Sequence, residues 1–175
     1  TIATYLIHSK LDYCNSLYIN LPDCQLNRLQ HVKNSLTRAV CMTSRPSHIT
    51  PSLKSLHWLK VRERIHYKIL SLTYNAIEHH QPHYLHSLIT IQPHRSTRSS
   101  SLVTLLRPAS TRIKLSNRAF YYCAPILWNS LPAYLRQPAD NTHKANSVPP
   151  STLALSRKQF LARLKTHLFR QSYPT

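Results

Sequence analysis

Apolar residues recur at intervals of three and four along much of this chain, which is the spacing that one buried face of an α-helix requires. The pattern is clearest from Asp23 onward, in a stripe formed by Leu26, Leu29, Val32, Leu36 and Val40. Similar stripes run through residues 2–18, 61–76 and 156–170, and Ser156 is a suitable N-cap for the last of them. The sequence therefore predicts a mainly α-helical fold.

Prolines and clusters of small polar residues divide the chain. Glycine is absent, so tight turns must use Asn, Ser and the 12 prolines. Two brief apolar segments, 102–106 and 111–115, can pair as a small β-hairpin, and a helix near residue 120 is expected to break at Pro125. The predicted organisation is a helical segment at 1–90, a linker with the hairpin at 91–117, a short helical segment at 118–136, a linker at 137–152 and a basic C-terminal helix at 153–175.

Positive charge dominates the composition. The chain holds 23 Lys and Arg residues but only 5 Asp and Glu, which leaves a formal net charge of +18. Internal pairing cannot neutralise this surplus, so the surface potential must be strongly positive. The basic residues are scattered rather than clustered in a run, which favours a folded basic face over a basic tail. A polyanion is the natural partner.

The acidic residues argue against catalysis by this chain alone. Two-metal phosphoryl transfer needs clustered carboxylates that hold cations about 4 Å apart. The complete acidic inventory has no two members close in sequence: Asp12, Asp23, Glu63, Glu78 and Asp140. No strand-turn-helix nucleophile motif stands out either. We therefore predict no catalytic residues.

Histidine and cysteine do not form a recognisable metal motif. His79, His80, His83 and His86 are clustered, but Pro82 interrupts any helix that would align them. No two of the four cysteines are closer than ten residues, whereas structural zinc sites usually pair cysteines two to four residues apart. We predict no metal site and no cofactor. Free thiols, the absence of a long apolar stretch and the lack of a signal-peptide pattern favour an intracellular protein, nuclear or cytoplasmic, without membrane contact.

Several short motifs occur in an order typical of one family. They are LDYCNSL at 11–17, LNRLQ at 26–30, HITP at 48–51, LKSLHWL at 53–59, RSTRSS at 95–100, RAF at 118–120 and LWNSLP at 127–132. This series resembles the region just downstream of the polymerase core in reverse transcriptases of LINE-type, Jockey-like non-LTR retrotransposons. The resemblance covers roughly residues 9–136.

The resemblance implies a non-catalytic C-terminal fragment of an RNA-directed DNA polymerase, in which a helical module follows the polymerase palm as a thumb does. The catalytic aspartates of that family lie upstream of the matched region, so the parent would be an enzyme and this fragment would be inactive alone. The implied partners are the upstream polymerase domain of the same polyprotein and RNA or DNA, bound without sequence preference. Glycines expected in the family's turns are replaced, as at Asn20, which is consistent with a decaying element.

Basic residues on the polar faces of the predicted helices are the candidate phosphate contacts. They are Arg28, Lys33, Arg38, Arg62, Lys68, Arg163 and Lys165. Aromatic residues stand beside several cations, and such rings can stack on unpaired bases. For Trp58 and Trp128 we favour a place in the core, because each follows an apolar helical stripe. The alternative to nucleic-acid binding is an orphan or exapted helical interaction protein without that function.

Overall fold

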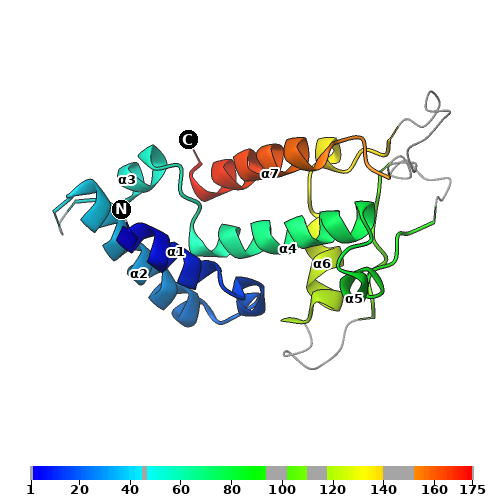
Figure 1. Ribbon diagram of the computed structural model, residues 1–175, viewed down its shortest axis with the longest axis horizontal. Helices are drawn as coiled ribbons and strands as arrows, with labels where there is room; N and C mark the ends of the chain where they lie inside the picture. Colours follow the sequence, from blue (N-terminus) through cyan, green and yellow to red (C-terminus); the bar gives the residue numbers. More distant parts are fainter. Residues whose placement is uncertain (1, 45–46, 94–101, 110–117, 140–151, 175) are drawn as a thin grey trace. The chain divides into compact units, whose positions relative to one another are not determined.

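The computed structural model describes residues 2–44, 47–93, 102–109, 118–139 and 152–174, and this part of the chain is mainly helical (Figure 1). Its seven α-helices are α1 (Ile2–Asp12), α2 (Asp23–Cys41), α3 (Thr50–Ser55), α4 (Val61–Glu78), α5 (His83–His86), α6 (Phe120–Asn129) and α7 (Arg157–Ser172). Two short 3₁₀ helices, η1 (Asn15–Tyr18) and η3 (Ala133–Leu135), accompany them. The predicted fold class is confirmed.

The described residues contain no β-strand. Two isolated antiparallel bridges join Ile91 to Leu105 and Pro138 to Leu153. Residues 111–115, one half of the predicted hairpin, lie outside the described residues, so the hairpin stays a prediction. Most of both predicted linkers also falls outside the described part.

The backbone contacts divide the chain into two compact units, and the division passes through α4 and α7. Unit 1 comprises residues 1–68 and 165–175, and unit 2 comprises residues 69–164. The five segments predicted from composition follow a different criterion and stay a prediction.

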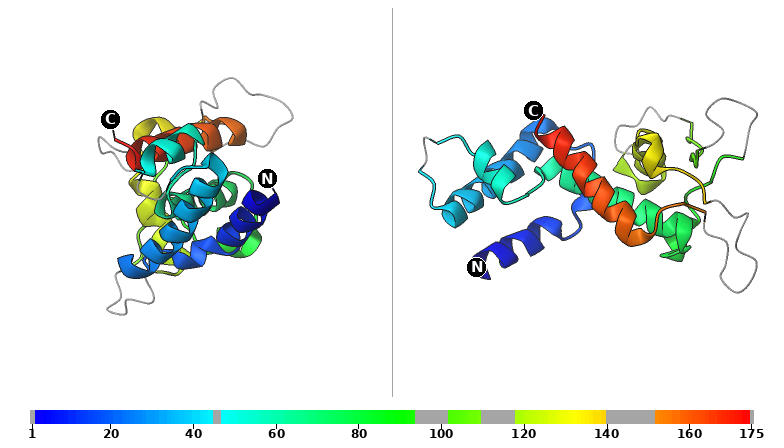
Figure 2. Two further views of the ribbon diagram at one scale, coloured as in Figure 1. Left: turned by 90° about the vertical axis from the view of Figure 1, so that its left-hand side faces the viewer. Right: turned by 90° about the horizontal axis from the view of Figure 1, so that it is seen from above.

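Unit 1 is organised around α2, which contacts both α1 and α3 (Figures 1 and 2). Pro22 precedes the helix and Asp23 places a negative charge in its first turn, where the helix dipole favours one. The helix ends because Met42 takes a left-handed conformation, which lets the backbone N–H of Thr43 donate to the Arg38 carbonyl at 3.1 Å. The fully buried apolar side chains of this unit include Leu36, Leu53, Leu59, Ile65 and Leu168.

Unit 2 is built on a stack of three rings. Phe160 packs against Tyr74 with ring centroids 4.6 Å apart and against Trp128 at 5.7 Å, and all three side chains are at most 1% exposed. Their polar atoms are satisfied, because the Tyr74 hydroxyl donates to the Leu155 carbonyl at 2.7 Å and the Trp128 Nε1–H donates to the Val103 carbonyl at 3.0 Å. The prediction that Trp128 belongs to the core is confirmed.

Of two predictions about individual helices, one was correct and one was wrong. Ser156 caps α7 as predicted: its Oγ accepts from the Gln159 backbone N–H at 3.4 Å, and Gln159 Oε1 accepts from the Ser156 N–H at 3.1 Å. This reciprocal pair is a capping box. The predicted break at Pro125 was wrong, since α6 continues through it. Burial of Cys123, Ala124 and Trp128 on this helix outweighs the loss of one backbone hydrogen bond.

Residues other than glycine adopt the left-handed backbone conformation at several turns. Positive φ angles of 50–56° occur at Cys14, Asn20, Met42, His57 and His80. Of these described residues, only Asn20 is of a type that we expected from the sequence at tight turns. Left-handed backbone costs most non-glycine residues about 1–2 kcal/mol, so neighbouring packing and capping bonds must offset that cost at the other four.

We expect Phe160→Ala to lower the free energy of unfolding by about 3–5 kcal/mol, because it empties the centre of the ring stack. Urea denaturation followed by circular dichroism measures this change. Tyr84→Ala is the matched control, since its ring is 68% exposed, and it should change stability by about 0.5 kcal/mol or less. A loss below about 1 kcal/mol for Phe160→Ala would mean that the stack is not the core of unit 2.

Candidate nucleic-acid interface

The seven predicted phosphate contacts do not share one environment. Five are exposed, namely Arg28, Arg62, Lys68, Arg163 and Lys165, whereas Arg38 is half-buried and Lys33 is 0% exposed. Arg62 is also engaged, because its guanidinium forms an ion pair with Asp23. Arg163 belongs to unit 2, and the remaining six belong to unit 1.

The expectation that Lys33 is exposed was wrong. The predicted apolar stripe of α2 holds at Leu26 and Leu36, which are buried, but not at Val32, which is 50% exposed while the neighbouring Lys33 is buried. The sequence spacing indicates a buried position for Lys33, because it stands seven residues after Leu26 and three before Leu36. A lysine at an apolar stripe position is usually assigned to the exposed face because it is charged, yet its long aliphatic stem can lie along a helix interface.

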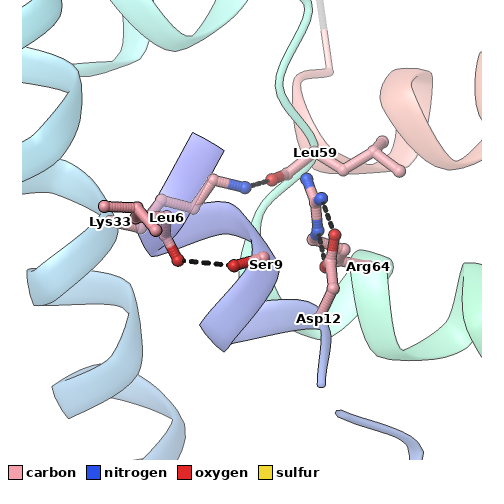
Figure 3. A network of polar contacts seen from close by, with 6 residues as sticks. All are labelled: Leu6, Ser9, Asp12, Lys33, Leu59 and Arg64. Atoms are coloured by element: carbon pink, nitrogen blue, oxygen red, sulfur yellow. Dashed lines mark hydrogen bonds and ion pairs between the residues drawn. The ribbon is translucent and has the colours of Figure 1, made fainter. Parts of the chain in front are cut away.

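Buried Lys33 needs partners and has them (Figure 3). Its ammonium donates to the backbone carbonyl of Leu59, and an ion pair between Asp12 and Arg64 lies beside it. The pKa of Lys33 is lowered from 10.5 to about 8, mainly by burial and also by the positive charge of Arg64, while the carboxylates of Asp12 and Glu63 act in the opposite direction.

Unit 1 contains a pocket of about 470 Å³, a size common for ligand sites. Its lining combines cations, aromatic rings and few acids: Asp12, Asn15, His57, Trp58, Leu59, Arg64, Tyr67, Lys68 and Lys165. Lys68 comes from α4 and Lys165 from α7, so folding brings together two of the predicted phosphate contacts that are distant in sequence. Trp58, predicted as core, is half-buried in the pocket wall.

The lining of this pocket carries more positive than negative charge. Asp12 is its one acidic lining residue, and both of its carboxylate oxygens accept hydrogen bonds from Arg64. Elsewhere, Asp23 pairs with Arg62, and Glu78 accepts from the backbone N–H groups of two loop residues at 3.1 Å each. Within the described residues no salt bridge reaches Lys68 or Lys165, so no ion pair neutralises either ammonium group.

Sequence reasoning missed several lining residues. Arg64 stands four residues before Lys68 on α4, a spacing that places both on one helix face. That spacing could have drawn attention to Arg64, whereas Asn15 and His57 lie within the motifs at 11–17 and 53–59 but have no feature there that indicates a pocket. His57 reaches the pocket wall from a turn with a φ of 52°, and its ring lies 5.7 Å from that of Phe169.

The other candidate chemistries find little support in the described part of the chain. It contains no group of three or more His, Cys, Asp or Glu side chains placed to hold a metal ion. His80 and His86 have ring centroids 4.3 Å apart, but Nδ1 of His86 is already 2.8 Å from the Ala76 carbonyl oxygen. All four cysteines are free thiols. None of the described helices has the length and hydropathy needed to cross a bilayer.

Comparisons with known proteins add no further constraint. No protein-family model, curated protein or solved structure matches this chain.

The lowered pKa of Lys33 predicts how stability changes with pH. Between pH 8 and 10.5 the unfolded chain keeps a proton on this lysine that the folded chain has lost, so the free energy of unfolding rises with pH. From pH 7 to pH 9 the expected contribution is about 1 kcal/mol.

Lys33→Met should remove this contribution, and urea denaturation of both proteins at the two pH values measures it. The comparison between the two proteins matters because burial raises the pKa of the Cys123 thiol from 9.0 to about 11, which makes stability fall above pH 9 in either protein. An identical pH response in wild type and variant would contradict the prediction.

Proposed function

We propose that this chain binds single-stranded nucleic acid through the unit 1 pocket and does not catalyse a reaction by itself. The observation that carries the proposal is the lining of that pocket: Lys68 and Lys165 without acidic partners in the described residues, next to the rings of His57, Trp58 and Tyr67. Cations suit the phosphates, and aromatic rings suit the bases.

The shape of the pocket favours an unpaired strand. A duplex presents its phosphates outward but keeps its bases stacked and paired inside, so it can reach only the cations at the pocket rim. A single strand can turn one base toward the aromatic wall while its flanking phosphates contact Lys68 and Lys165. The described lining presents no pattern of donors and acceptors that distinguishes one base from another, so we propose binding without sequence preference.

The family resemblance gives this binding a biological context. In a LINE-type reverse transcriptase, a helical module after the polymerase palm would hold template RNA or target DNA while the upstream domain supplies the catalytic aspartates. We propose that this chain is such a non-catalytic C-terminal fragment. Its motif order supports that assignment, and its net charge of +18 fits a nucleic-acid partner.

One observation favours the alternative, a helical protein-interaction function. Ile2, Tyr5 and Leu6 on α1 are 82%, 76% and 55% exposed and stand at helical spacing, so they form an uncovered apolar face. Such faces often mark protein contacts. The two functions differ in salt dependence, because only phosphate binding releases condensed counterions.

The test uses a fluorescein-labelled 12-nucleotide RNA and fluorescence anisotropy over a series of salt concentrations. We expect the logarithm of the affinity to fall by about 0.7 per phosphate contacted for each tenfold rise in salt. Lys68→Ala with Lys165→Ala should weaken binding on the order of tenfold and reduce the slope by about 1.4, because two phosphate contacts are lost.

The matched control is Lys10→Ala with Lys158→Ala, which removes the same charge from two exposed lysines that do not line the pocket. This control should keep most of the affinity. Equal weakening in both double variants would show that the total charge matters rather than the pocket, and a flat salt profile would eliminate nucleic-acid binding in favour of the alternative.

A further inference from the structure

Lys33 lies directly behind the wall of the pocket. Its ammonium donates to the Leu59 carbonyl, and Leu59 is itself a lining residue (Figure 3). A small cavity of about 10 Å³ beside Lys33 is lined by Asn15 and Arg64, and both of these residues also line the pocket. A buried positive charge therefore stands behind residues that a ligand would touch.

The contact with Leu59 also fixes the pocket wall. Leu59 belongs to the segment 56–60 between α3 and α4, which carries His57 and Trp58 into the pocket. The Tyr173 hydroxyl holds the same segment by donating to the Trp58 carbonyl at 2.8 Å. A hydrogen bond from a charged donor is stronger than one from a neutral donor, so the protonated form of Lys33 positions this segment more firmly.

The charged and titratable groups that face Lys33 come from three elements. Asp12 approaches from α1, Tyr18 from η1, and Glu63 and Arg64 from α4. Because Arg64 and Asp12 neutralise each other in an ion pair, burial remains the main factor that disfavours the ammonium. A phosphate that enters the pocket would add a negative charge on this side and favour the ammonium.

We propose that Lys33 is a positioning residue for the pocket and that binding of a nucleic-acid strand is coupled to protonation of this lysine. The proposal rests on the proposed function, because it concerns the same site. By reciprocity, any strand that raises the proton affinity of Lys33 must bind more weakly when that proton is absent. Affinity should therefore fall as the pH rises through the range in which Lys33 loses its proton, which lies near pH 8.

The experiment measures the affinity of the full 175-residue chain for the 12-nucleotide RNA at pH 7.0 and pH 9.0 and at constant ionic strength. For wild type we expect roughly fivefold weaker binding at pH 9.0, the size of effect that one unit charge exerts across a partly screened protein interior. Lys33→Met, which keeps the length of the side chain but not its charge, should abolish most of this ratio.

Two further variants separate the roles of Lys33. Lys33→Gln retains a neutral donor toward Leu59, and we expect it to restore part of the affinity lost in Lys33→Met while still lacking the pH response. Lys10→Met removes one exposed positive charge from the same unit and should keep the pH response of wild type. The same ratio in wild type, Lys33→Met and Lys10→Met would overturn the proposal.

A second measurement on wild type avoids any dependence on whether a variant folds. The Nζ resonance of Lys33, followed by NMR over the same pH range with and without RNA, should show a pKa that increases when the strand is bound. An unchanged titration with RNA bound overturns the coupling but leaves nucleic-acid binding in place. Absence of RNA binding at pH 7.0 and low salt overturns the proposed function, and the coupling with it.

Discussion

The ion pair between Asp12 and Arg64 is the contact on which the arrangement of unit 1 depends. It joins the end of α1 to the first turns of α4, and both Nε and Nη2 of Arg64 donate to the carboxylate. With α1 held there, Lys33 of α2 is enclosed and directed to the Leu59 carbonyl. The paired Arg64 thus lines the same pocket as Lys68 and Lys165, and the buried Lys33 lies behind its wall at Leu59.

The few acidic residues mostly form polar contacts within the fold. Three of the four acids in the described residues form polar contacts within their own unit: two pair with arginines, and Glu78 accepts from backbone N–H groups. Asp23 and Glu78 lie outside the pocket lining, and Asp12, which does line the pocket, is paired with Arg64. The large surplus of positive charge is thus a property of the outer surface, where it can attract polyanions over several ångströms.

Helical periodicity predicted the fold class, the capping of α7 by Ser156 and the burial of Trp128, because those features depend on residues close in sequence. It failed at Val32 and Lys33, where side-chain polarity predicted a buried valine and an exposed lysine, and the packing of α2 buries the lysine and exposes the valine. Lys68 and Lys165 were named as phosphate contacts from their exposure alone. Their meeting at one pocket depends on tertiary folding, and so does the participation of Asn15 and His57, whose motifs do not indicate a pocket.

The left-handed residues differ in what their side chains contribute. Met42 is 94% exposed, so little beyond the backbone geometry of the α2 terminus is required of it, and glycine would adopt that geometry without steric strain. At His57, which has the same kind of backbone, the ring forms part of the pocket wall. The chain therefore requires little of the side chain at Met42, whereas at His57 the left-handed backbone carries a ring that lines the pocket. Its tolerance of substitution should follow that difference rather than the backbone angle that the two turns share.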